Sequence, residues 1–68
     1  MTAAQPGIQL YRVPEAMRML GLSRSVVYEL IRSGRLRSVR EGRARRVPAS
    51  AIADYIALLE HEAAAAAQ

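Results

Sequence analysis

The chain contains no cysteine, tryptophan, phenylalanine or lysine, and only one histidine among its 68 residues. Without cysteine it can form neither disulfides nor thiolate metal sites, and His61 alone cannot build a metal site. No run of residues is long and apolar enough to cross a bilayer, and the N-terminus lacks the apolar centre of a signal peptide. We therefore expect a cytoplasmic protein that binds no metal and no other cofactor.

The combinations of side chains that catalysis requires are missing as well. The sequence offers no nucleophile with a partner base, no glycine-rich phosphate loop and no carboxylate pair in a plausible cleft. Glu60 and Glu62 flank His61, but on the polar end of an expected helix these residues form a solvated surface. The sequence predicts no catalytic residue and no enzymatic activity.

Charge is distributed unevenly along the chain. All ten basic residues are arginine, and residues 24–46 hold eight of them against two glutamates, a local net charge of +6. Residues 47–68 hold no arginine and three acidic residues. GC-rich codons explain the choice of arginine over lysine, but they do not explain this clustering. The distribution predicts that the middle of the chain faces a polyanion and that its end faces water or a partner.

One amphipathic segment, residues 23–33, organises the sequence. Ser23 occupies a helix N-cap position and Gly34 ends the helix. The apolar side repeats at i, i+3, i+4 and consists of Val27, Leu30 and Ile31. A shorter helix over residues 13–20, with Pro14 in its first turn, precedes it after a turn of about three residues. This layout predicts a helix-turn-helix, whose second helix enters the DNA major groove.

Residues 36–47 predict a β-hairpin, which would add a wing to the two helices. A three-residue loop over residues 42–44 would place Val39 opposite Val47, with both valines on the buried face. A two-residue loop would pair Val39 with Arg46 and leave one valine without a buried neighbour. Burial favours the three-residue loop.

This register assigns a position to each arginine of the hairpin. It places Arg40 and Arg46 on the outward face and Arg43 at the tip, and it directs Arg45 inward, where it would partly neutralise Glu41. Arginines on the outward face and at the tip suit phosphates or the minor groove.

A third helix is expected from Ala51 to about Glu60, with Ser50 as its N-cap. Its apolar stripe repeats at i, i+3, i+4, i+7 and consists of Ile52, Tyr55, Ile56 and Leu59. This helix would cover the back of the other two. Alanine is the best helix former, so the alanine-rich tail, residues 61–68, could extend the helix, although nothing in the sequence obliges it to be ordered.

The sequence thus predicts a mainly α fold with a small β-hairpin, a winged helix-turn-helix of three helices and a two-stranded wing over residues 10–60. Residues 1–9 are expected to form a disordered leader. Leu10 and Tyr11 could form a short edge strand or pack across the core. Arg12 stands where a helix would prefer Ser or Thr, so we expect no capping box with Glu15.

Eight residues are candidates for contact with DNA, from the exposed side of residues 23–33 and from the wing. They are Ser23, Arg24, Ser25, Tyr28, Arg32, Arg40, Arg43 and Arg46. Ser23 is foremost a cap, and Tyr28 either packs at the helix edge or binds a phosphate. Arg32 is a solvated residue or a clamp on the DNA backbone, and Glu29 either orients an arginine or repels wrong approaches.

Four segments together resemble the excisionase-type helix-turn-helix domain, which is itself similar to the DNA-binding part of MerR regulators. They are Val-Pro-Glu-Ala at 13–16, Leu-Gly-Leu-Ser-Arg-Ser-Val-Val-Tyr at 20–28, Ile-Arg-Ser-Gly-Arg-Leu at 31–36 and Gly-Arg-Ala-Arg-Arg-Val-Pro at 42–48. The chain departs from the family at Arg12, where Ser or Thr is usual, and at Glu41, where an apolar residue is usual.

The resemblance implies a winged helix with residues 23–33 in the major groove and the wing, residues 40–46, in the adjoining minor groove. It implies one of two functions. The first is a recombination directionality factor that binds repeated sites, bends DNA and helps a tyrosine integrase to excise an integrated element. The second is a small MerR-like transcription regulator. A monomer with so little surface should bind one site weakly, so we expect cooperative assembly on DNA.

A hypothesis of another class is a protein-interaction or antitoxin-like module, whose arginines would meet an acidic protein. DNA binding predicts affinity for random duplex that weakens steeply with salt, whereas an interaction module would ignore duplex DNA at physiological ionic strength.

Overall fold

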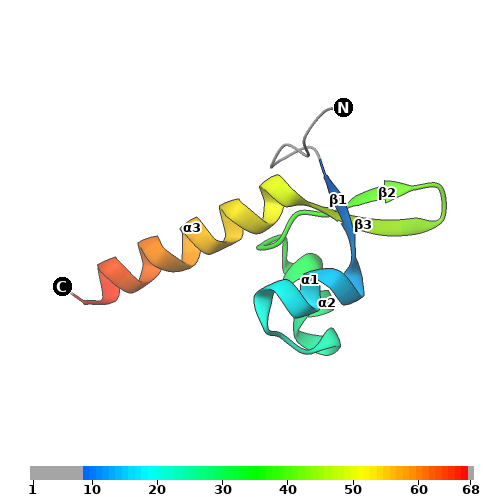
Figure 1. Cartoon of the computed structure of the whole chain (residues 1–68). Coiled ribbons are helices and arrows are strands. Elements are labelled where there is room, and N and C mark those ends of the chain that lie inside the picture. Colours follow the sequence, from blue (N-terminus) through cyan, green and yellow to red (C-terminus); the bar gives the residue numbers. More distant parts are fainter. Residues whose placement is uncertain (1–8, 68) are drawn as a thin grey trace.

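The computed structural model describes residues 9–67, so the leader expected over residues 1–9 lies outside the described residues except for Gln9. The elements are β1 (Leu10–Arg12), α1 (Val13–Leu20), α2 (Arg24–Ser33), β2 (Val39–Glu41), β3 (Ala44–Pro48) and α3 (Ala49–Ala66). Figure 1 shows α1 and α2 on one side of the sheet, the β2–β3 hairpin extending to one end and α3 to the other. This arrangement confirms the predicted winged helix-turn-helix.

The three strands form one antiparallel sheet in the order β1-β3-β2. Leu10 pairs with Pro48, Tyr11 with Val47 and Arg12 with Arg46. Leu10 and Tyr11 therefore form the edge strand, and Tyr11 also packs against the core, so both expected alternatives hold for Tyr11. The wing is the β2–β3 part of this sheet, and β1 ties its base to the start of α1.

The helices of the helix-turn-helix have the predicted boundaries because the capping residues act on nearby backbone groups. Gly21 adopts φ +69° and its N–H donates to the carbonyl of Met17, which closes α1. The Oγ of Ser23 accepts a hydrogen bond from the N–H of Val26 at 3.3 Å, which caps α2. Gly34, at φ +86°, ends α2 in the same way.

The start of α1 differs from expectation. The backbone N–H of Arg12 donates to Oε1 of Glu15 at 2.8 Å, so the glutamate half of a capping box does form. A guanidinium has no acceptor atom, so Arg12 cannot supply the reciprocal bond that a serine or threonine would make.

The predicted hairpin register is wrong. Val39 pairs with Arg46, Arg40 with Arg45 and Glu41 with Ala44, so the loop contains two residues. Gly42, at φ +63°, occupies the first position of this turn, where a two-residue turn of type II′ requires glycine. Val39 remains 41% exposed. The hairpin projects beyond the two helices (Figure 1), so β2 faces no core and turn chemistry outweighs the burial of Val39.

The start of α3 is also corrected: Pro48 is its N-cap and Ser50 lies within the first turn. The N–H of Ala49 donates to the carbonyl of Gln9 at 2.8 Å, so the main chain before β1 satisfies the first of the free N–H groups of α3. The helix continues well past Glu60, through the alanines to Ala66. Among the described residues, no helix is long and apolar enough to span a membrane.

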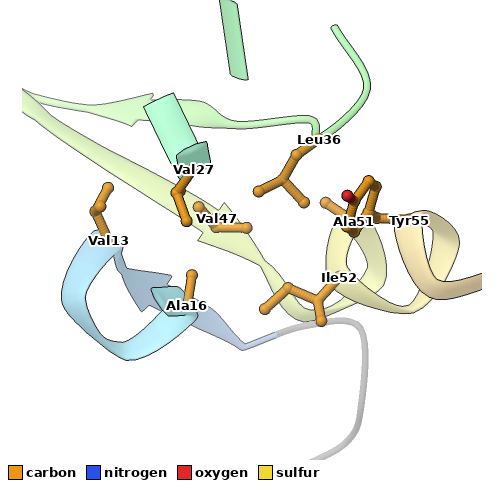
Figure 2. Packing of buried hydrophobic residues seen from close by; sticks show 8 residues of the cluster. All are labelled: Val13, Ala16, Val27, Leu36, Val47, Ala51, Ile52 and Tyr55. Carbon is orange, nitrogen blue, oxygen red and sulfur yellow. The ribbon is translucent and has the colours of Figure 1, made fainter. Parts of the chain in front are cut away.

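The core is a single cluster of eight buried residues drawn from α1, α2, the loop after α2, β3 and α3 (Figure 2). They are Val13, Ala16, Val27, Leu36, Val47, Ala51, Ile52 and Tyr55. Leu36, Val27 and Val47 are the largest side chains that are fully buried. Leu36 belongs to the loop between α2 and β2. Leu30 and Ile31, predicted as core, are only partly buried at its edge.

The packing of α3 contradicts the expectation that it covers the back of the other helices. Ile52 and Tyr55 are buried, but Ile56 and Leu59 are 42% and 41% exposed. Only the first part of α3 packs on the body, against β3, and the remainder extends past it (Figure 1). The molecule is accordingly elongated, 44 × 30 × 18 Å.

Replacing Leu36 of the loop by alanine should destabilise the protein more than replacing Leu30 of α2. Leu36→Ala removes a side chain with 0% exposure and should cost about 2–5 kcal/mol of unfolding free energy, whereas Leu30→Ala should cost less because Leu30 is only partly buried. Denaturant unfolding measures both. Val39→Ala is the control, with an expected change within about 0.5 kcal/mol. If the Leu36 and Val39 variants were equally stable, the assignment of Leu36 to the core would be wrong.

Candidate nucleic-acid interface

The side of α2 that faces away from the core is polar and exposed from its first residue. Arg24 and Ser25 begin the helix, Tyr28 follows one turn later, and all three are exposed. The Oγ atoms of Ser23 and Ser25 lie 3.4 Å apart, within hydrogen-bond distance. The N-terminal end of α2 therefore presents a cation and two hydroxyls in the position from which recognition helices contact base edges.

Arg32 lies on the same side of α2 but is already paired. Its Nη2 donates to Oε1 of Glu29 at 2.6 Å, one turn back along the helix. Both side chains are largely exposed, so this pair stabilises the helix by about 0.5 kcal/mol at most. Glu29 thus orients an arginine, which was one of its two expected roles.

The two-residue turn gives the wing two faces of different charge. On one face Glu41 accepts a hydrogen bond from Nε of Arg46 at 3.1 Å, so the charge of Arg46 is neutralised within the hairpin. On the other face Arg40 lies directly opposite Arg45. Like charges opposite each other destabilise a strand pair, and a phosphate bound between them would relieve the repulsion.

These positions correct the roles expected of the wing arginines. Arg40 and Arg46 lie on opposite faces, and Arg46 rather than Arg45 binds Glu41. Arg45 donates instead to Oγ of Ser38 at 2.7 Å. Arg43 is exposed within the turn at the tip of the wing, as expected.

A shallow groove of about 450 Å³ separates the start of α2 from β3. It is lined by Arg12, Val13, Pro14, Arg24, Tyr28, Ala44, Arg45 and Arg46. Four of these residues are arginines and none is acidic. A groove with this charge, bounded by a helix start and a hairpin, suits a phosphodiester strand.

Comparison with known proteins agrees with this geometry. A family model described as a helix-turn-helix domain matches residues 10–57. A probable excisionase from Saccharopolyspora erythraea is 48% identical over 61 residues, which cover 90% of this chain and 62% of the relative. An excisionase from Streptomyces ambofaciens is 48% identical over 56 residues, which cover 82% of this chain and 87% of the relative. The chain belongs to the excisionase family of helix-turn-helix proteins.

The chain spans just under two thirds of the length of the first of these curated relatives. No solved structure matches it. The segment matched by the family model begins in β1 and ends in the middle of α3, so it contains the whole arginine-lined groove.

Sequence reasoning missed two of the arginines that line this groove, Arg12 and Arg45. A two-residue turn at Gly42 would have indicated Arg45, because it places this residue beside Arg40 on one face. No signal in the sequence could have indicated Arg12, since its position depends on the pairing of β1 with β3, which brings it opposite Arg46 across 33 intervening residues.

Two further arginines, both in the loop after α2, are bound to α3 and not to the groove. Arg35 makes two hydrogen bonds to Glu62, of 3.0 and 2.9 Å, and its guanidinium carbon lies 5.9 Å from the centre of the Tyr55 ring. Arg37 donates to Asp54 at 2.7 Å. These contacts, here called the α3 clasp, connect the loop that carries Leu36 to two positions on α3, Asp54 and Glu62, that lie eight residues apart.

The Arg35–Glu62 pair also shifts the pKa of both side chains. The hydrogen bond from Arg35, together with its positive charge, holds the pKa of Glu62 below its ordinary value of 4.5. The same contact raises the pKa of Arg35 above its ordinary value. A carboxylate whose pKa is lowered in the folded state contributes stability above its unfolded pKa, and this contribution is lost as the pH falls through the lowered value.

The clasp predicts a specific acid sensitivity. As the pH falls from about 5 through the lowered pKa of Glu62, the melting temperature of the unmodified protein should decline more than that of Glu62→Gln. Thermal melts followed by circular dichroism across this range test the prediction. Glu60→Gln is the control, because Glu60 has no ion-pair partner in the described part of the chain. Equal slopes for the native chain and Glu62→Gln would contradict the role of the clasp.

Proposed function

We propose that the protein binds double-stranded DNA, with the start of α2 in the major groove and the wing on adjoining phosphates or in the minor groove. The observation that carries the proposal is the groove between α2 and β3, which is lined by four arginines and by no acidic residue. Of these four, only Arg46 is paired with a glutamate, Glu41, in the described part of the chain. The width of the groove is set by the core, because Val27 of α2 and Val47 of β3 belong to the same buried cluster.

The side chains of this surface divide into a few proposed roles. Arg24, with Ser25 beside it, contacts base edges, since the first residues of a recognition helix approach them most closely. Tyr28 binds a phosphate through its hydroxyl, since it lines the groove. Arg40, Arg43 and Arg45 bind phosphates along the face of the wing that carries no glutamate. Ser23 is a cap, and Arg32 and Arg46 make secondary contacts with phosphates, because a glutamate already pairs with each of them.

We further propose that this binding serves excision of an integrated element. The protein would bind repeated sites in the attachment region, bend the DNA and help a tyrosine integrase to assemble the excisive complex, with no catalytic step of its own. It would work in the cytoplasm, as a monomer in solution that assembles cooperatively on DNA. Both relatives carry the name excisionase, which favours this function over a small transcription regulator.

Two arginine variants should distinguish base recognition from phosphate binding. Arg43→Ala should weaken binding to all duplexes alike and reduce the slope of log affinity against log salt by about 1. Arg24→Ala should instead reduce the preference for the specific site by about 1–3 kcal/mol. Fluorescence anisotropy over a range of salt concentrations, with specific and random duplexes, measures both effects.

Arg18→Ala is the matched control, because Arg18 is exposed on α1 and outside the groove. Unchanged binding by Arg43→Ala would show that the wing does not contact DNA. If the unmodified protein failed to bind random duplex at low salt, an interaction module would be the better interpretation.

Excision itself is tested by recombination in vitro. The purified protein, added to its neighbouring integrase and a plasmid carrying the recombined attachment sites, should increase excision at least about tenfold, and Arg24→Ala should abolish that increase at limiting protein. A footprint on the attachment region identifies the bound sites. Strong footprints without any effect on excision would instead indicate a transcription regulator.

A further inference from the structure

Glu41 is the only acidic residue of the wing. It ends β2, directly before the turn, and its carboxylate accepts the hydrogen bond from Nε of Arg46 at 3.1 Å. Arg46 lines the groove proposed for DNA, whereas Glu41 does not. The one carboxylate of the wing therefore binds an arginine of the DNA-binding groove from outside the groove.

Arg46 lies where a positive charge needs a partner of opposite sign. It belongs to the central strand β3, with Arg12 opposite it on β1 and Val39 opposite it on β2. Arg12 also lines the groove, so two like charges face each other across this strand pair, which destabilises the pairing. Glu41 offsets the repulsion while no DNA is bound. The carboxylate thus takes the role that a phosphate would have in a complex with DNA.

The two members of this ion pair are not held equally firmly. The side chain of Arg46 is 23% exposed and that of Glu41 is 62% exposed, so the sheet fixes the arginine while the carboxylate can turn into solvent. Within residues 9–67, Arg46 donates to Glu41 through Nε alone, whereas Arg35 donates to Glu62 through both terminal nitrogens. An ion pair with an exposed carboxylate contributes little stability. A phosphate that reaches Arg46 can therefore displace Glu41 and bind the guanidinium through two nitrogens.

The pair makes the contribution of Arg46 depend on how closely DNA is bound. Two opposite charges only 3.1 Å apart largely cancel at a distance, and salt screens charges separated by more than about 10 Å. A duplex held loosely by the exposed arginines therefore gains nothing from Arg46. A duplex seated on the start of α2 brings a phosphate into the groove at a high effective concentration, and this phosphate competes with Glu41.

We infer that Glu41 is a specificity-determining residue of the wing. By competing for Arg46, it keeps this arginine out of contacts with random duplex and releases it only to a phosphate that a seated site places in the groove. This inference rests on the proposed function and deepens it. It assigns part of the discrimination between specific and random DNA to a side chain outside the groove.

The test is Glu41→Gln, which removes the negative charge and keeps an oxygen that can accept the hydrogen bond from Arg46. Affinity for random duplex should rise about five- to tenfold near 0.1 M salt, and the slope of log affinity against log salt should steepen by about 1, because Arg46 then adds one phosphate contact. Affinity for the footprinted site should rise at most about twofold, since Arg46 is already bound there. Fluorescence anisotropy on duplexes of equal length measures both affinities.

Two double variants separate the role of Arg46 from that of net charge. Glu41→Gln/Arg46→Gln and Glu41→Gln/Arg18→Gln both carry the net charge of the unmodified protein. The first should return the random affinity and the salt slope to those of the unmodified protein, whereas the second should keep both raised, because Arg18 is exposed outside the groove. Circular dichroism establishes that both are folded at the assay temperature.

Glu60→Gln is the single-residue control. It changes the net charge by the same amount as Glu41→Gln, but Glu60 lies on α3 and has no ion-pair partner in the described part of the chain. Both of its affinities should stay within about twofold of those of the unmodified protein.

Contrary outcomes distinguish this inference from the proposed function. Equal gains on the specific and random duplexes in Glu41→Gln would make Glu41 a general repulsive charge and would overturn its role in specificity. A raised random affinity that persists in Glu41→Gln/Arg46→Gln would show that Glu41 does not act through Arg46. If the unmodified protein bound neither duplex, the proposed function itself would be refuted.

Discussion

The shared burial of Val27, Leu36 and Val47 is the constraint on which the molecule depends. These three side chains come from α2, from the loop after it and from β3, and each is 0% exposed. A chain of 68 residues without cysteine has no disulfide to support so small a core. The same contact that stabilises the fold therefore also fixes the distance between the recognition helix and the wing, and with it the shape of the arginine-lined groove.

The positive charge of the chain is divided by the fold into two groups. Four of the ten arginines form ion pairs in the described part of the chain: Arg32, Arg35, Arg37 and Arg46. Two of these pairs hold α3, one stabilises α2 and one neutralises a face of the wing. Arg24, Arg40 and Arg43 form no ion pair there and are exposed. The net charge of a segment therefore overstates the number of arginines that are available to bind DNA, because this number depends on where each arginine lies in the fold.

Helix α3 has two parts that its amphipathic pattern does not distinguish. The stripe from Ile52 to Leu59 is continuous in sequence, and its periodicity correctly predicted a helix. Only Ile52 and Tyr55 have the body of the protein opposite them, so only they are buried. Periodicity reports which residues share a face, but what lies across from that face depends on the rest of the fold.

Local chemistry allowed the sequence alone to determine the helix-turn-helix. Gly21, Ser23 and Gly34 act on backbone groups within four residues of themselves, so the ends of α1 and α2 and the exposed side of α2 followed directly. The sequence offered two hairpin registers, and the choice between them, which exchanges the roles of Arg45 and Arg46, was decided only by the tertiary structure, as was the placement of Arg12. Each of these depends on what lies opposite in space: β3 lies between two strands, and β2 has no core beneath it. These neighbours are brought together only when the chain folds, so the sequence pattern alone does not identify them.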